Sequence, residues 1–327
     1  MSLVPRHIKD LKPYVSGKSQ SEFKREFGNL SSIKLASNEN PLGSSPKSIK
    51  KMQMAVSSVN RYPDSSGYEL RLALSQKHNL SIDNVILGAG SEGIMSNIMR
   101  TFLSGKDEII SSKNSFIGFR VLADASGFKS KWAPMKNFHY DLDAIANMID
   151  VNTKIIYLAN PDNPTGTYFN KNEFDDFMRV VPERVLIILD EAYYEYALDV
   201  DDYPDSMLYR YDNVITLRTF SKVYGLAGFR VGYGFAHEEL IAKSRIVQAE
   251  AESKHWLTAT WRPALMWICI LVIANNYILA PVLNAFFGTS LELSIPDPMW
   301  NLLTIGVGGY IAGRSGEKIA QKWKENS

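Results

Sequence analysis

Short apolar runs recur along the first three quarters of the chain, separated by longer amphipathic segments. The runs are continuous and rich in β-branched residues, which is typical of strands buried on both faces of a sheet. They span 84–88, 108–111, 154–159, 185–190, 214–219 and 231–235, with a weaker run at 129–133. Helix-length segments such as 92–103, 141–149 and 171–180 lie between them. This alternation predicts an α/β fold with a seven-stranded, mostly parallel sheet covered by helices on both faces.

The pattern changes after residue 263. Residues 264–287 contain no charged side chain, and a second uncharged run covers 299–313. A membrane-spanning helix needs roughly 20 apolar residues, so the two runs predict an α-helical transmembrane hairpin. Basic residues flank the pair while the loop between them has none, which places both ends in the cytoplasm by the positive-inside rule. The alternative is a hairpin buried in a soluble domain, because the second run is short.

Composition and charge exclude some classes of protein. The chain has 327 residues, enough for two domains, and 36 basic against 35 acidic residues. This balance argues against a nucleic-acid partner. The single cysteine, Cys269, excludes an intramolecular disulfide, and the mixed, polar first residues predict no cleaved export signal.

Candidate chemistry lies where four of the predicted strands end, which is where ligands bind in parallel sheets. Residues 88–93 read GAGSEG and match G-x-G-x-x-G, a pattern whose glycines and helix start suit a phosphate group. One interpretation is a dinucleotide site, with Glu108 as the acid that binds the ribose. The same physics serves any phosphorylated cofactor, so this interpretation stays an alternative.

The other three strand ends supply an amide, an acid and an amine. Asn163 lies in a loop with two Asn-Pro pairs, and Asp190 ends a strand where an unpaired carboxylate is costly. Lys222 follows a strand amid small residues, and Arg230 offers a planar fork for a phosphate. A lysine can form a Schiff base when burial lowers its pKa. Pyridoxal phosphate needs these groups together.

The motifs KLASNENPLG (34–43), RYPDSSGYELR (61–71), ILGAGSEG (86–93), ANPDNPTGT (159–167), LDEAYYEY (189–196) and RTFSKVYGLAGFRVGYG (218–234) carry a family resemblance. Together they resemble histidinol-phosphate aminotransferases, which are class I/II aminotransferases of fold type I. The resemblance implies a pyridoxal 5'-phosphate (PLP) enzyme that forms a homodimer. It also implies amino transfer between L-glutamate and imidazole-acetol phosphate, with 2-oxoglutarate as the other product, in histidine biosynthesis.

The resemblance also assigns roles to single residues. Lys222 would bind the cofactor aldehyde and then move the substrate proton, and Asp190 would keep the pyridine nitrogen protonated. Tyr193 and Asn163 would bind the phenolic oxygen, and Phe116 would stack on the ring. The phosphate would be held by Ser91, Glu92, Ser221 and Arg230, and by Tyr62 of the neighbouring subunit. Lys222, Asp190 and Tyr193 are thus the expected catalytic residues.

The aminotransferase resemblance ends near residue 245. We expect a large domain over 1–245 with the family's small C-terminal domain missing, and a membrane tail over 246–327. The tail resembles phage holins of the three-transmembrane type, with two candidate spans. The substrate-binding arginine of the family has no counterpart in this tail, so transamination is expected to be impaired. Two alternatives remain, a holin-like membrane protein with an inactive aminotransferase passenger and a nucleotide-binding oxidoreductase.

Overall fold

The computed structural model describes residues 3–9, 11, 17–28, 30–207 and 211–252. The chain divides into two compact units, Met1–Gln248 and Ala249–Ser327. The two predicted membrane spans, 264–287 and 299–313, lie outside the described residues. Within the described ranges, no helix combines the length and the apolar character needed to cross a bilayer.

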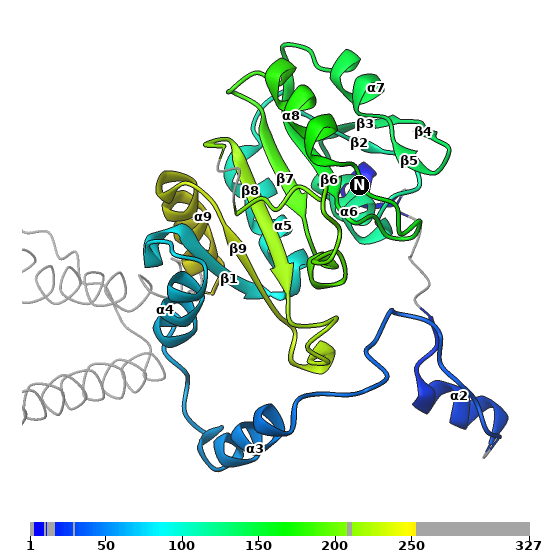
Figure 1. Cartoon of the computed structure of the whole chain (residues 1–327), viewed down its shortest axis with the longest axis vertical. Coiled ribbons are helices and arrows are strands. Elements are labelled where there is room, and N and C mark those ends of the chain that lie inside the picture. The colour runs from blue at the N-terminus through cyan, green and yellow to red at the C-terminus, as the bar shows by residue number, and fades with distance from the viewer. Residues whose placement is uncertain (1–2, 10, 12–16, 29, 208–210, 253–327) are drawn as a thin grey trace, which may run out of the picture. The chain divides into compact units, whose positions relative to one another are not determined.

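A seven-stranded sheet forms the centre of the first unit, in the order β1-β9-β8-β7-β6-β2-β3 (Figure 1). Neighbours from β8 to β3 run parallel, whereas β9 is antiparallel to both β1 and β8. This confirms the predicted α/β class and the mostly parallel sheet. The strands are β1 Val85–Ala89, β2 Glu108–Ser112, β3 Lys129–Ala133, β6 Thr153–Ala159, β7 Leu186–Asp190, β8 Val214–Thr219 and β9 Val231–Phe235.

Helices connect the strands, and three of them were predicted from sequence. The predictions at 92–103, 141–149 and 171–180 correspond to α5 Gly90–Phe102, α7 Leu142–Asn147 and α8 Lys171–Val180. In α8 the side chain of Asn170 caps the backbone N–H of Glu173, whose carboxylate caps Asn170 in return, so the helix start is fixed locally. The other described α-helices are α1 Arg6–Lys9, α2 Gln20–Phe27, α3 Pro46–Ala55, α4 Tyr68–Lys77, α6 Ile117–Ser126 and α9 Glu238–Glu252.

The central strands are buried on both faces, as their continuous apolar sequences predicted. Every residue of β2, β7 and β8 is buried. Two short strands, β4 Met135–Lys136 and β5 His139–Tyr140, form a separate antiparallel pair that the apolar pattern did not predict. Strand pairing also determines which carboxyl ends of the strands lie together. Ala159 pairs with Asp190, and Asp190 pairs with Leu217, so β6, β7 and β8 end side by side.

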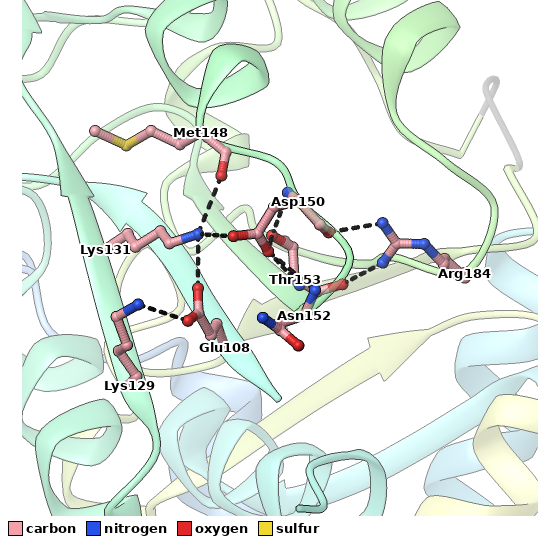
Figure 2. Close-up of polar contacts among 8 residues, drawn as sticks. All are labelled: Glu108, Lys129, Lys131, Met148, Asp150, Asn152, Thr153 and Arg184. Atoms are coloured by element: carbon pink, nitrogen blue, oxygen red, sulfur yellow. Dashed lines mark hydrogen bonds and ion pairs between the residues drawn. The ribbon is translucent and has the colours of Figure 1, made fainter. Parts of the chain in front are cut away.

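An ion-pair cluster lies at the opposite ends of the parallel strands, where these strands begin (Figure 2). Glu108 starts β2 and binds Lys129 at 2.7 Å and Lys131 at 2.6 Å, and Lys131 also binds Asp150 at 2.6 Å. The guanidinium of Arg184 donates to the carbonyls of Asp150 and Thr153. A ribose-binding acid belongs at the carboxyl end of a strand. The dinucleotide interpretation of Glu108 is therefore wrong, because this carboxylate lies at the other end and is held by two lysines.

Residues 17–70 form an N-terminal arm in which no described residue is buried. The arm carries α2, α3 and the 3₁₀ turn Val56–Ser58. Large apolar side chains on it are exposed, among them Ile33, Leu35, Leu42 and Val59 at 76–93%. Isolated exposed apolar residues are ordinary, but a run of them along one segment is typical of an interaction surface.

Candidate active site

A cavity of about 570 Å³ opens at the carboxyl ends of β6, β7 and β8. It brings together nine of the ten residues that the sequence nominated. Ser91, Glu92, Phe116, Asn163, Asp190, Tyr193, Ser221, Lys222 and Arg230 all line it. The tenth, Tyr62, lies on the N-terminal arm and is fully exposed, so it does not reach the cavity of its own chain. Its assignment to a neighbouring subunit stays a prediction.

Lys222 provides a half-buried amine in the cavity. Its Nζ donates a hydrogen bond to the carbonyl oxygen of Ser37 at 3.0 Å and lies 5.5 Å from the ring centroid of Tyr193. Burial lowers the pKa of Lys222, and the charge of Arg230 adds to this, while Asp190 opposes it. A lowered pKa enlarges the fraction of neutral amine, which is the form that attacks an aldehyde.

Asp190 ends β7 as a buried acid with two unequal oxygens. Oδ2 accepts a hydrogen bond from the phenol of Tyr157 at 2.8 Å. Oδ1 is buried and has no hydrogen-bond partner among the described residues. Burial raises the pKa of Asp190 to about 6, against the opposing effects of the Tyr157 phenol, the backbone N–H of Ala192 and the charge of Lys222. An unpaired buried oxygen is costly, so this atom favours a ligand that brings a hydrogen-bond donor.

The phenol of Tyr193 receives two amide donors. Asn38 Nδ2 lies 2.8 Å from its oxygen and Asn163 Nδ2 lies 3.2 Å from it. Burial raises the pKa of Tyr193, so the phenol keeps its proton. The oxygen can therefore donate to an anionic ligand oxygen, while Asn163 supplies a second donor beside it.

The start of α5 forms the end of the cavity that suits a phosphate. Gly90 begins the helix at a φ of 73°, a conformation that favours glycine, and the free N–H groups of the first turn follow. Arg230 Nη1 reaches Ser221 Oγ at 3.5 Å, and its Nη2 lies 3.5 Å from the carboxylate of Glu92. These groups supply both hydrogen-bond donors and a positive charge for an anion. The carboxylate of Glu92 would repel one, so the part of Glu92 that suits a phosphate is its backbone N–H.

Three residues of the site were missed at the sequence level. Asn38 and Ser37 come from the N-terminal arm, and Tyr157 lies inside an apolar strand. Asn38 belongs to the motif at 34–43, whose sequence alone does not indicate which of its side chains contacts the site. Period two along β6 was the available signal for Tyr157, because it places Tyr157 on the same face of the sheet as Ala159, the partner of Asp190.

The residues present fit pyridoxal phosphate, the cofactor expected from the resemblance. The cofactor's aldehyde needs an amine of low pKa, its ring nitrogen an acid, its phenolic oxygen a donor and its phosphate an anion site. Lys222, the free Oδ1 of Asp190, the Tyr193–Asn163 pair and the start of α5 supply these groups in one cavity. The unpaired Oδ1 is the most specific of these observations, because it lacks the partner that the ring nitrogen provides.

This fold and this site are those of a fold type I pyridoxal-phosphate enzyme. The model of the family described as aminotransferase class I and II matches residues 31–260. The chain belongs to the class I and II aminotransferases. A second family, holin of 3TMs for gene-transfer release, matches residues 224–315 and overlaps the end of the first match.

Curated relatives and solved structures agree with this family. The histidinol-phosphate aminotransferase of Anaeromyxobacter sp. is 45% identical over 244 residues, which cover 74% of this chain and 67% of the relative. Histidinol-phosphate aminotransferase 1 of Nitrosococcus oceani is 41% identical, covering 71% and 63%. The crystal structure of the Sinorhizobium meliloti histidinol-phosphate aminotransferase in complex with pyridoxal 5'-phosphate superposes with a TM-score of 0.67 at 27% identity, covering 78% and 66%. The chain thus spans about two thirds of the length of these relatives.

Proposed function

We propose that this chain transfers an amino group from L-glutamate to imidazole-acetol phosphate, the reaction that yields histidinol phosphate and 2-oxoglutarate in histidine biosynthesis. The observation that carries the proposal is the half-buried Lys222 in the same cavity as the unpaired oxygen of Asp190. The names of the relatives at 41–45% identity support the choice of substrate.

The chain's own residues divide the chemistry among them. When bound, pyridoxal phosphate supplies an aldehyde that takes up the amino group and a ring that accepts an electron pair. The neutral amine of Lys222 would remove the proton from the substrate Cα. It would then deliver a proton to the cofactor carbon that carried the aldehyde. Asp190 would hold a proton at the ring nitrogen, and Tyr193 and Asn163 would bind the phenolic oxygen. These residues would keep the ring in one orientation.

The test of the cofactor site uses the full chain in detergent with pyridoxal phosphate. We expect a visible absorbance band and, after borohydride reduction, a stable label on Lys222. Lys222→Ala should abolish both, whereas Lys113→Ala, at an exposed lysine outside the cavity, should change neither. A colourless wild-type protein, or a label that persists in Lys222→Ala, rejects the enzymatic function.

We also propose a homodimer in which the N-terminal arm of one chain covers the site of the other. The exposed apolar residues of the arm need a protein surface, and the fully exposed Tyr62 lies on the same segment. A second copy would bury the arm and bring the Tyr62 phenol to the phosphate end of its cavity. This arrangement explains why a residue nominated for the site lies away from it in a single chain.

A membrane anchor is the second candidate function, supported by the uncharged run at 264–287 and by the holin family match. We propose that the tail at 246–327 inserts in the inner membrane and leaves the aminotransferase part in the cytoplasm. Ile273→Lys places a charge near the middle of the first run, which opposes insertion by about 2.5–3.5 kcal/mol. The variant should leave the membrane on carbonate washing while Thr289→Lys stays bound. Release of the unaltered chain by the same wash rejects the anchor.

A further inference from the structure

Tyr157 is a fully buried residue whose phenol contacts Asp190, and the proposed reaction does not yet give it a role. It lies on β6 with an exposed fraction of 0%, and it lines the same cavity as Lys222. Its oxygen donates to Asp190 Oδ2 at 2.8 Å. The neighbouring strands explain the reach, because Tyr157 lies two residues before Ala159, which pairs with Asp190.

The ring of Tyr157 is held in place independently of that hydrogen bond. It stacks on Phe119 of α6, with ring centroids 3.9 Å apart and the planes 10° from parallel. Phe119 is itself 1% exposed. Burial raises the pKa of Tyr157 well above that of an ordinary tyrosine, so its oxygen keeps the proton that it donates. The phenol is therefore a fixed donor aimed at one carboxylate oxygen.

A fixed donor on one oxygen orients the whole carboxylate. With Oδ2 bound to the phenol, rotation of the Asp190 side chain would break a hydrogen bond to a charged group, which is stronger than a neutral one. Oδ1 is then left as the oxygen without a partner. The same bond stabilises the ionised carboxylate against the burial that favours its neutral form.

We infer that Tyr157 is a positioning residue for the reaction: its phenol holds Asp190 ionised and turns Oδ1 toward the ring nitrogen of the cofactor. The inference rests on the proposed function. In this inference Tyr157, a strand residue outside the expected catalytic set, orients the carboxylate of Asp190.

The test compares the full-length wild-type chain with Tyr157→Phe, which keeps the stacked ring and removes only the hydroxyl. The control is Tyr211→Phe, which removes a hydroxyl that donates to Asp175. Tyr211 lies just before β8 and does not line the active-site cavity. Three quantities are measured, namely the Asp190 pKa in the cofactor-free chain by carboxyl ¹³C NMR, the ring ¹⁵N shift of bound pyridoxal phosphate and its dissociation constant. Asp190→Asn assigns the carboxyl signal.

Tyr157→Phe should raise the Asp190 pKa by about one unit and weaken cofactor binding about tenfold, in line with a hydrogen bond to a charged group. The ring ¹⁵N shift should move toward the unprotonated form, because a more basic carboxylate takes more of the shared proton. Tyr211→Phe should leave all three quantities unchanged. Equal values in Tyr157→Phe and Tyr211→Phe overturn the inference.

A second variant keeps the test decisive if Tyr157→Phe does not fold. Replacement of Tyr157 by 3-fluorotyrosine makes the phenol a stronger donor with almost the same shape, so the Asp190 pKa should fall rather than rise. A purely structural role predicts no such reversal, and an unchanged pKa overturns the inference. Failure of the proposed function is recognised separately, since a wild-type chain that binds no pyridoxal phosphate still reports the Asp190 pKa.

Discussion

Lys222 and Asp190 each lie in surroundings that disfavour their own charge. Burial lowers the pKa of the amine and raises that of the acid, and the attraction between the two opposes both shifts. Each group is therefore closer to its neutral form than in water, and a small change in its neighbours shifts the balance. This is the state that a base and a proton holder need near neutral pH.

The Asp190 pKa of about 6 predicts how cofactor binding depends on pH. As pH falls through about 6 the carboxylate gains a proton and loses its attraction for a protonated ring nitrogen, so affinity should fall by up to about tenfold per pH unit. Lys222, Glu191 and Tyr157 are the titratable groups that act on Asp190 most directly. The measurement is a fluorescence titration of the cofactor-free chain.

Asp190→Asn is the control for this pH dependence. The phosphate of the cofactor also titrates at a pKa of about 6, and this contribution is common to both proteins. The difference between wild type and Asp190→Asn therefore isolates the carboxylate. Parallel curves for the two proteins would contradict the assigned pKa.

Gly232 shows how little space separates β9 from the phosphate end of the cavity. A Cβ at this position would overlap the backbone of Gly90 and Ser91, which cannot move aside as a flexible side chain can. Gly232→Ala should destabilise the fold by about 1–3 kcal/mol, as overpacking does, and weaken cofactor binding. Denaturant unfolding and a binding titration measure the two effects.

Gly228→Ala is the matched control, because an added Cβ at Gly228 meets nothing within 4 Å. Its effect on unfolding should stay within about 0.5 kcal/mol. Equal stability of the two alanine variants would show that the approach of β9 to Gly90 is not tight.

The end of strand β7 serves two purposes. Asp190, its last residue, lines the cavity, whereas Glu191, the residue that follows the strand, forms a fully buried ion pair with Arg218 at 2.7 Å. The guanidinium carbon of Arg218 lies 3.4 Å from the ring centroid of Tyr194, whose phenol donates to Asp205. The segment that carries the site residues is therefore anchored by residues that do not line the cavity.

Arg218→Ala should destabilise the chain by about 3–5 kcal/mol, because it leaves the buried carboxylate of Glu191 without its partner. Arg179→Ala breaks an ion pair of two exposed side chains, with Asp176, and should change stability by less than about 1 kcal/mol. Chemical unfolding of both variants measures the difference. Comparable values for the two would mean that the buried pair is not a main support of β7.

The seven main strands and the mostly parallel character of the sheet were predictable from sequence, but the two antiparallel pairings were not. Continuous apolar runs fixed the seven main strands, because burial on both faces leaves a signal within five to seven residues. The same signal is silent on direction, so the antiparallel pairing of β9 with β1 and β8 came only from the structure. The two-residue strands β4 and β5 are too short to carry a period.

Site residues were predictable where the chemistry is local to a strand end. Asp190 ends a strand, Lys222 and Asn163 come within a few residues of a strand end, and the structure brings all three to one cavity. Asn38 reaches the cavity from an arm whose described residues are all exposed or partly exposed, so hydrophobic periodicity could not place it. Tyr157 reads as one more apolar strand position, since its polar atom matters only once Asp190 is its neighbour.

At the scale of the whole molecule the exposed arm predicts that each active site uses two chains. Tyr62→Ala and Lys222→Ala chains should each form sites that fail to bind pyridoxal phosphate tightly. When the two are unfolded together and refolded, each mixed dimer should regain one intact site, formed by the Lys222 of one chain and the Tyr62 of the other. Borohydride labelling of the mixture measures this recovery.

Recovery in the mixture, compared with each variant refolded alone, is the decisive contrast. If each site is built from one chain, the mixture should bind no more cofactor than the average of its two components. That outcome would remove the shared-site dimer while leaving the Lys222 assignment in place.

The position of β9 has a consequence for synthesis of the protein. β9 is the last strand of the sheet to be made, yet it lies between β1 and β8 and pairs with both. Until residues 231–235 have left the ribosome, the first strand made has no neighbour and Gly90 faces no Gly232. A nascent chain that already contains Lys222 therefore still lacks the strand that completes the phosphate end of the cavity. Cofactor binding must therefore follow the pairing of β9 with β1. Pairing between strands so distant in sequence is a slow step of folding.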